Sequence, residues 1–389
     1  MSRPVDEQLL GDAAALTRAD PAQVLLALAS AGAQVREAVV RSEEAGVRTI
    51  AEDDRPRSVL VASLGGSALV AEVLAMLAGG GSPLPLSVRR SPPLPGWVGP
   101  LDLVVAVSLS GRAAGPLALA AEAGRRGARL LTVGAAGSPL AEVCARARGV
   151  HVPTGSASSV PTSSRTGLWS LLVPVLRAAH ALGAVDVPDS VLAATADRLD
   201  AEAEQCRPSS EVFVNPAKTL AVQLAGTVPV VLGDGEVTGV AARRAAAMLA
   251  RTARTPAVHG SLPDDASEVV ATFDGPFTAG QDNVFDDPFI DGERSAPLRL
   301  LMLREPAPQP DVDDQAAFER SALADRVRTM AEEVGVRVTE VAADPGHDLT
   351  RLAGLVARTD FAATYLALGL GLDPATSPHV ADLRDARGR

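Results

Sequence analysis

The hydrophobic positions of this chain fall into short apolar runs that alternate with longer stretches of helical periodicity. Five runs in the first half have the length of strands, and most of their residues are apolar: 58–63, 84–88, 102–108, 128–133 and 149–153. Helical stretches lie between most of these runs, at 68–78, 113–126 and 138–147. Because strands that are buried on both faces and connected through helices form parallel sheets, the pattern predicts a parallel sheet covered by helices.

The second half of the chain repeats this alternation. Strands are expected at 227–233, 255–260, 297–303 and 336–341, and helices at 214–226, 237–253, 313–334, 348–371 and 376–386. A long helical region at 166–206, interrupted near Gly183 and Pro188, separates the two halves. An amphipathic helix is expected at 20–45, with Asp20 as its N-cap and Pro21 in its first turn. The predicted fold class is therefore α/β, with two αβα units.

These elements divide the chain into four segments. We expect an N-terminal helical segment (1–50), a first αβα domain (51–185), a linking helix (186–212) and a second αβα domain with C-terminal helices (213–389). A chain of 389 residues, 47% of them hydrophobic, is long enough for two domains that each bury a core. Segment 273–293 departs from the pattern, because it places phenylalanines among acidic side chains. We expect an ordered surface loop there, with a lid or a subunit contact as alternatives.

The net charge and the hydropathy exclude some classes of partner. A formal net charge of −11 argues against nucleic acid, because phosphate backbones attract basic surfaces. A small anion remains compatible with this charge, since amides and hydroxyls bind phosphate locally. No apolar run is long enough to span a membrane, and residues 1–20 carry charges throughout, unlike a signal peptide. We therefore expect a cytoplasmic protein without a membrane partner.

Cysteine and lysine are both rare in this chain. Cys144 and Cys206 are the two cysteines, and neither has metal-like spacing, so we expect two reduced, buried thiols. No cluster of histidine, cysteine and carboxylate residues indicates a metal, and we expect no cofactor. Lys218 is the only lysine, which reflects either a specific need or chance.

Two predicted strand-to-helix turns are rich in glycine and serine. The first is Gly65-Gly66-Ser67 within "VASLGGSALVAEVL" (61–74), and the second ends "VVAVSLSG" (104–111) with Ser108, Ser110 and Gly111. Such turns expose backbone N–H groups at a helix N-terminus, where the helix dipole favours an anion. Serine hydroxyls donate hydrogen bonds without adding a charge that needs a partner.

These two turns predict one phosphate site if their strands are neighbours. In that case both turns flank the crevice at the carboxyl ends of the strands, and Gly66, Ser67, Ser108, Ser110 and Gly111 bind the phosphate. The alternative for each turn alone is a helix N-cap, for which serine is a favoured residue. Neither GxGxxG nor GxxxxGK[ST] occurs in the turns, so the common nucleotide sites are excluded.

Further short motifs follow these turns in a fixed order. They are "RRGARLLTVGAAGSPLAE" (125–142), "NPAK" (215–218), "PVVLG" (229–233) and "TYLALGLGLDPATSPHVADLR" (364–384). With Gly65-Gly66-Ser67 and Ser108-Leu109-Ser110-Gly111-Arg112-Ala113, they resemble a sugar isomerase (SIS) domain protein of the bifunctional phosphoglucose/phosphomannose isomerase family. The resemblance covers most of the chain.

This resemblance implies two tandem SIS domains, each a parallel, flavodoxin-like sheet covered by helices. It also implies aldose–ketose isomerisation of hexose 6-phosphates, which belongs to carbohydrate metabolism and proceeds by proton transfer between C1 and C2 through an enediol. The implied ligand is a hexose phosphate, and the implied assembly is a homodimer.

The family's catalytic pattern is substituted in this chain. Alignment on Pro256-Ala257 places Arg251 at the family's glutamate base, and a guanidinium group cannot abstract a proton. In "PDDASE" (263–268), Ala266 stands where the family has a histidine. By resemblance the phosphate-binding half is mostly kept, whereas the proton-transfer half is not.

Four residues form a conceivable replacement set. Asp265 and Glu268 supply carboxylates, His259 supplies an imidazole, and Arg165, by analogy with a family arginine, would stabilise an enediolate. The alternative is structural: Asp265 forms a turn with Asp264, Glu268 is an exposed helical acid, and His259 ends a strand.

Three functions stay open at this point. The first is an isomerase-like protein that binds a hexose phosphate. The second is a non-catalytic sugar-phosphate sensor, or a scaffold in mannose metabolism. The third is an isomerase of different substrate choice that uses Asp264, Asp265 or Glu268. Because Arg251 occupies the family's base position, a direct assay of proton exchange is needed to separate them.

Overall fold

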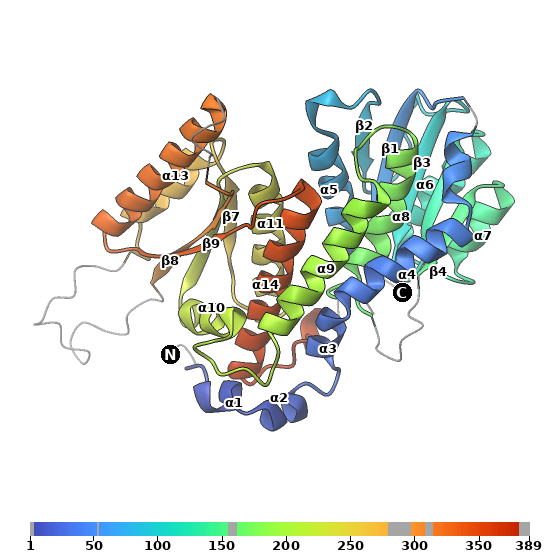
Figure 1. The fold of residues 1–389 in the computed structure, drawn as a ribbon. Helices are drawn as coiled ribbons and strands as arrows, with labels where there is room; N and C mark the ends of the chain where they lie inside the picture. The colour runs from blue at the N-terminus through green and yellow to red at the C-terminus, as the bar shows by residue number, and fades with distance from the viewer. Residues whose placement is uncertain (1–3, 53, 155–161, 279–296, 308–313, 381–389) are drawn as a thin grey trace, which may run out of the picture. The chain divides into compact units, whose positions relative to one another are not determined.

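The computed structural model describes residues 4–52, 54–154, 162–278, 297–307 and 314–380 (Figure 1). The chain divides into two compact units, one formed by residues 29–200 and the other by residues 1–28 together with 201–389. Among the described residues, no helix combines the length and the apolar character that crossing a membrane requires.

The unit formed by residues 29–200 contains a sheet of five parallel strands. The strands are β1 (Ser58–Ser63), β2 (Leu86–Arg89), β3 (Asp102–Ser108), β4 (Arg129–Ala135) and β5 (Val150–Thr154), in the order β2-β1-β3-β4-β5. Its helices are α4 (Ala31–Glu44), α5 (Ala68–Ala78), α6 (Ala114–Arg125), α7 (Pro139–Arg146), α8 (Leu168–Ala181) and most of α9 (Asp189–Gln205). Short 3-10 turns are η1 (Val47–Ala51), η2 (Gly65–Ser67) and η3 (Gly79–Gly81).

The other unit contains a sheet of four parallel strands. The strands are β6 (Val228–Gly233), β7 (Val258–Ser261), β8 (Leu298–Arg304) and β9 (Arg337–Ala342), in the order β7-β6-β8-β9. Its helices are α1 (Glu7–Gly11), α2 (Ala13–Ala19), α3 (Val24–Ala29), α10 (Pro216–Leu224), α11 (Glu236–Arg251), α12 (Ala266–Ala271), α13 (Gln315–Glu333) and α14 (Asp348–Gly369). A 3-10 turn, η4 (Thr272–Asp274), follows α12.

Each sheet is covered by apolar helix faces, as strands buried on both faces require. Every residue of β1 and β3 is buried, and Leu60 and Val104 pack in one cluster with Leu119 of α6. In the second sheet, Leu300 packs in one cluster with Val327 of α13. These cores confirm the predicted α/β fold with two parallel, helix-covered sheets.

The helix expected at 20–45 is wrong as a single element. Asp20 accepts hydrogen bonds from the N–H groups of Val24 and Leu25, both at 2.9 Å, so the helix begins at Val24 and Pro21 lies outside it. The chain then breaks at Ser30, where φ and ψ are −81° and 5°, and α4 starts at Ala31.

Several expected features lie wholly or partly outside the described residues. Most of the acidic, phenylalanine-containing segment 273–293 falls within 279–296, and most of the helix expected at 376–386 falls within 381–389. The expectation for the cysteines is confirmed, since Cys144 and Cys206 are both free and buried.

Candidate functional site

The strand order of the first sheet reverses between β1 and β3. These strands are direct neighbours, with Ser63 paired to Val107, while the chain runs from β1 to β2 on one side and from β3 to β4 on the other. Such a reversal of strand order is the place where open parallel sheets bind ligands, beyond the carboxyl ends of the strands. The segments that follow β1 and β3 are the two serine-containing turns predicted from the sequence.

The first turn forms the 3-10 element η2 and leads directly into α5. Gly65 adopts a left-handed conformation (φ 63°), which glycine takes without strain. Ser67 is 8% exposed and is the N-cap residue of α5, yet its side chain makes no capping hydrogen bond. The alternative interpretation of Ser67 as an ordinary N-cap is therefore not supported, and its hydroxyl is not committed to the helix.

The second turn is held by its own serines. Ser108 Oγ accepts a hydrogen bond from Ala113 N at 3.3 Å, and Ser110 Oγ accepts one from Arg112 N at 3.3 Å. A hydroxyl that accepts such a bond still has its own proton to donate. The helix α6 begins after Ala113, which has no side-chain oxygen, so no side chain of Ala113 caps its first turn. An anion would satisfy N–H groups at such an uncapped end.

Gly111 fixes the path of this turn. Its φ is 64°, and a Cβ at this position would lie 2.0 Å from Oγ of Ser138, the N-cap of α7. Leu109 O accepts hydrogen bonds from Ala135 N at 3.0 Å and from Thr154 Oγ1 at 3.3 Å. The ends of β4 and β5 therefore brace the turn, which gives it the rigidity that a preformed binding site needs.

Arg165 lies in a turn that packs against the Ser108–Gly111 turn. Arg165 is buried, its N–H donates to Ser163 Oγ at 3.2 Å, and Gly167 N donates to Ser163 O at 2.8 Å. A Cβ placed on Gly167 would lie 3.3 Å from a methyl carbon of Leu109. The structure thus brings the segment that carries Arg165 next to the Ser108–Gly111 turn.

The other three residues of the replacement set lie in the other unit, around the end of β7. Asp265 Oδ2 accepts a hydrogen bond from Ser261 N at 2.7 Å, so this carboxylate closes the turn before α12. Glu268 is exposed in the first turn of α12. His259 lies on β7 with much of its surface exposed. Partial burial of its ring together with the nearby Arg243 lowers its pKa, although Asp265 opposes the shift. A neutral imidazole can accept a proton, whereas Asp265 already has a structural hydrogen bond.

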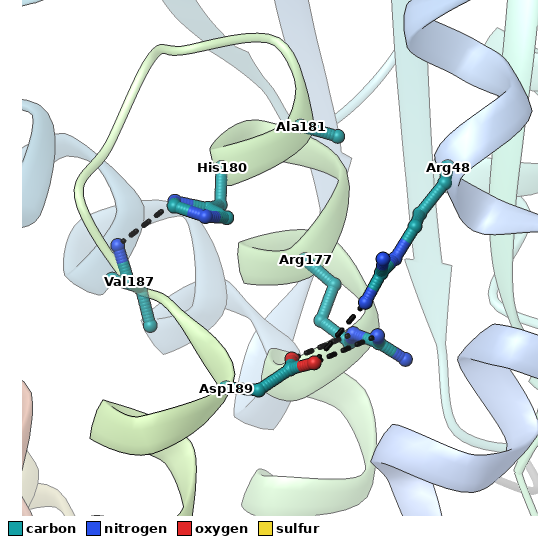
Figure 2. Close-up of a pocket in the computed structure, with 6 residues that line it drawn as sticks. All are labelled: Arg48, Arg177, His180, Ala181, Val187 and Asp189. Atoms are coloured by element: carbon teal, nitrogen blue, oxygen red, sulfur yellow. Dashed lines mark hydrogen bonds and ion pairs between the residues drawn. The ribbon is translucent and has the colours of Figure 1, made fainter.

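A cavity of about 340 Å³ lies elsewhere in the first unit, where α8 ends and α9 begins (Figure 2). Arg48 and Arg177 line it, and both pair with Asp189, at 3.1 Å and 3.4 Å. Arg177 also pairs with Glu43 at 2.9 Å. Because carboxylates already neutralise both guanidinium groups, this cavity is not an anion site.

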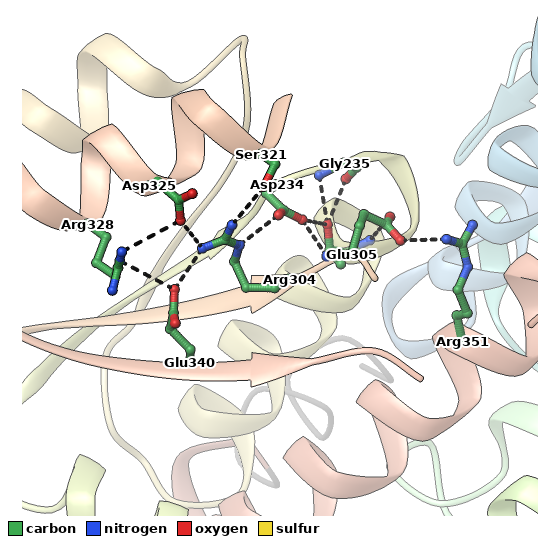
Figure 3. Close-up of polar contacts among 10 residues, drawn as sticks. Asp234, Gly235, Arg304, Glu305, Ser321, Asp325, Arg328, Glu340 and Arg351 are labelled. Carbon is green, nitrogen blue, oxygen red and sulfur yellow. Dashed lines mark hydrogen bonds and ion pairs between the residues drawn. The ribbon is translucent and has the colours of Figure 1, made fainter. Parts of the chain in front are cut away.

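No metal centre is found among the described residues, where no group of three or more His, Cys, Asp and Glu side chains is placed to hold an ion. Two features of this chain's crevices were missed from the sequence. Arg112, exposed in the Ser108–Ala113 turn, adds a positive charge beside the neutral serine hydroxyls. In the second sheet, Asp234 and Glu305 follow the neighbouring strands β6 and β8 (Figure 3). The glycine-flanked turn Gly233-Asp234-Gly235 was the signal available for this second crevice.

Comparisons with known proteins agree with this geometry. Residues 213–386 match the family model described as bacterial phospho-glucose isomerase C-terminal SIS domain. A bifunctional phosphoglucose/phosphomannose isomerase of Caldicellulosiruptor bescii is 25% identical over 344 residues, which are 88% of this chain and 92% of that protein.

Two solved structures share the fold. A hypothetical protein of Thermus thermophilus is 17% identical, with a TM-score of 0.67, and the match covers 100% of this chain and 99% of that one. The C-terminal domain of glucosamine-fructose-6-phosphate aminotransferase from Francisella tularensis is 13% identical, with a TM-score of 0.59, over 90% of this chain and 98% of that one. At these identities the similarity shows the fold alone.

Proposed function

We propose that this chain is a SIS protein of the phosphosugar isomerase type whose first domain binds the phosphate group of a hexose 6-phosphate. The observation that supports the proposal most strongly is that β1 and β3 are neighbours. Both serine-containing turns therefore follow the two strands between which the strand order reverses. Ser67, Ser108 and Ser110 donate from their hydroxyls, and the turn at Gly66 contributes backbone N–H groups. The expected donation from Gly111 N is not supported, because this N–H already donates to Ser108 O at 2.8 Å. Two helices, α5 and α6, begin at these turns with no side-chain cap from their N-cap residues.

A hexose 6-phosphate is the ligand class that the related isomerase suggests. The phosphate is a dianion near neutral pH, and helix N-termini together with hydroxyl donors stabilise it despite the chain's net charge of −11. Arg112 adds a cation at the loop. By the same resemblance we propose a homodimer in the cytoplasm, which sedimentation at several protein concentrations would test.

Aldose–ketose isomerisation is the second part of the proposal. It requires a base near C1 and C2, and Arg251 at the family's glutamate position cannot serve. His259 is the one imidazole of the replacement set, and partial burial together with the nearby Arg243 lowers its pKa, which favours the neutral form that can accept a proton. Asp265 is tied to Ser261, and Glu268 is exposed. The role of Arg165 in stabilising an enediolate is proposed from the resemblance alone.

A non-catalytic sugar-phosphate sensor is the alternative, and the substituted base position favours it. The same phosphate site then serves to report ligand concentration. The third alternative, an isomerase of different substrate choice that depends on Asp264, Asp265 or Glu268, has less support, because Asp265 closes a turn.

Binding is tested by the thermal stability of the protein with fructose 6-phosphate. A ligand at 100 times its Kd stabilises the folded state by about 2.7 kcal/mol. Each of Ser67→Ala and Ser110→Ala should weaken binding about tenfold or more, because a hydrogen bond to a charged group is lost. Ser190→Ala, an exposed serine in the same unit, is the matched control and should bind as the wild type does. Unchanged affinity in both loop variants would contradict the phosphate site.

Catalysis is tested by NMR of fructose 6-phosphate in D2O. An isomerase exchanges a proton at C1 or C2 for deuterium, and His259→Ala should slow this exchange by about 100-fold or more, as expected for a lost general base. Glu268→Ala tests the carboxylate alternative, and the exposed Glu333→Ala is its control. Stabilisation by the sugar phosphate without any exchange supports the sensor and rejects the isomerase.

A further inference from the structure

The strand order of the second sheet also reverses between two neighbouring strands, as it does in the first sheet. Here carboxylate side chains lie at the ends of these two strands. β6 and β8 are neighbours, with Gly233 paired to Leu303, and their connections leave on opposite sides of the sheet. The chain passes from β6 through Asp234 and Gly235 into α11, and it leaves β8 at Glu305. A ligand crevice is therefore expected at this edge as well.

Glu305 contacts a helix N-terminus and an arginine at this end of the sheet (Figure 3). Its side chain is buried, its Oε1 accepts a hydrogen bond from Thr238 N at 3.4 Å, and its Oε2 pairs with Arg351 Nη1 at 2.9 Å. Thr238 N lies in the first turn of α11, a helix of 16 residues. A helix N-terminus and an arginine are groups that bind a phosphate. Here the Glu305 carboxylate of the same chain accepts a hydrogen bond from the helix N-terminus and pairs with the arginine.

The fit of this carboxylate is close. A Cβ on Gly235 would lie 2.8 Å from Glu305 Cγ and 2.9 Å from its Oε1, so the side chain rests directly on the turn. Burial raises the pKa of Glu305, and Arg351 opposes that shift. The pairing with Arg351 gives the buried carboxylate a counterion, which a buried charge requires.

Asp234 fixes Glu305 from the other side. Its Oδ1 accepts a hydrogen bond from Glu305 N at 2.6 Å, and its Oδ2 pairs with Arg304 Nε at 2.9 Å. Arg304 also pairs with Asp325 at 3.0 Å and with Glu340 at 2.8 Å. The backbone at Glu305 is therefore held in one position by hydrogen bonds and ion pairs among side chains of this unit.

The corresponding turns of the first domain differ from those of the second. Leu64–Ser67 and Ser108–Ala113 contain no acidic residue, and Ser67 makes no capping bond. We propose that Glu305 is an internal ligand of the second domain's anion position, so that the chain takes up phosphate in its first domain only. The count of one phosphate per chain rests on the function proposed above, whereas the part played by Glu305 does not.

Removing the internal carboxylate should open a new phosphate site. In a Ser67→Ala/Ser110→Ala background, which removes the first site, Glu305→Ala should bind one inorganic phosphate that the background protein does not bind. Isothermal titration and equilibrium dialysis with phosphate give the number bound. Glu305→Ser is a second opening variant with a small polar side chain, and circular dichroism verifies that each variant is folded.

Two further variants separate this site from a general change in charge. Adding Arg351→Ala to the Glu305→Ala protein should abolish the gained phosphate, because the cation is lost. Glu340→Ala removes an equal charge from the Arg304 network but leaves Glu305 in place, so it should gain none. A phosphate gained equally by Glu340→Ala would overturn the assignment to this position.

The outcomes also separate this proposal from the proposed function. Two phosphates bound per wild-type chain, or no gain in both Glu305 variants, overturns the internal-ligand proposal while the first-domain site stands. A wild type that binds none, together with a gain in the Glu305→Ala protein, overturns the first-domain site and supports the role of Glu305.

Discussion

Lys218, the only lysine of the chain, acts as a structural cation. It is buried, and its Nζ donates hydrogen bonds to Pro208 O and Ser210 O, both at 2.7 Å. It also lies 5.4 Å from the centre of the Tyr365 ring, a cation–π contact. Burial lowers the pKa of Lys218 to about 8. The lysine therefore fixes the turn before α10, and the structure favours a specific need over chance.

Replacing this lysine should destabilise the protein in a pH-dependent manner. Lys218→Met leaves two carbonyl groups without their donor, which costs about 2–4 kcal/mol of unfolding free energy near pH 7. Because the folded-state pKa of about 8 lies below the ordinary lysine value of 10.5, the unfolded chain binds more protons between these pH values. The wild type should therefore gain stability relative to Lys218→Met as pH rises through this window. Urea unfolding at several pH values from neutrality to the upper end of this window measures the difference, and a constant difference would contradict the burial of the ammonium group.

The Ser108–Gly111 turn depends on a backbone conformation that a single methyl group disrupts. Gly111→Ala should lower the free energy of unfolding by about 2–4 kcal/mol, since left-handed strain adds to a clash with Ser138. Gly65→Ala is the matched control: its φ is 63°, but nothing lies within 4 Å of the added carbon, so only about 1–2 kcal/mol of strain is expected. Urea unfolding of both variants tests this, and equal losses would show that the contact with Ser138 is unimportant.

The elements that could be predicted from the sequence are those whose limits are set locally. Strand 58–63 is β1 and helix 68–78 is α5, because a buried apolar run and a glycine on either side of the helix mark their ends. The helix expected at 20–45 was predicted incorrectly because Asp20 reaches past Pro21 to cap residues 24 and 25. The spacing of apolar residues does not show whether an aspartate caps a helix that begins directly after it or, as here, a helix that begins four residues later.

At the scale of the whole molecule, the order of the strands could not be predicted from the pattern of residues. The serine turns could be identified, but that β1 lies beside β3 follows from packing of the entire sheet. The same holds for Asp234 and Glu305, which are 71 residues apart and meet only because β6 and β8 are neighbours. The periodicity predicted two parallel, helix-covered sheets, and the resemblance to SIS proteins implied the same architecture, which the structure confirms.

The two compact units should unfold as separate transitions, because each has its own sheet and core. A buried ion pair within each unit provides a selective probe. Asp360 pairs with Arg244 at 2.9 Å, and both side chains are almost fully buried, in the unit that contains the β6–β9 sheet. Asp102, fully buried, pairs with Arg57 at 2.7 Å in the other unit.

Replacing Asp360 or Asp102 by asparagine removes the negative charge of the ion pair. The resulting loss of unfolding free energy depends on how deeply the remaining arginine is buried. Asp360→Asn leaves the buried Arg244 without its counterion, which costs about 3–5 kcal/mol, and should lower one calorimetric transition only. Asp102→Asn should lower the other transition by less, because Arg57 is half exposed and regains water. Differential scanning calorimetry of the two variants and the wild type measures both midpoints. If either substitution shifted both transitions together, the units would be unfolding as one cooperative body.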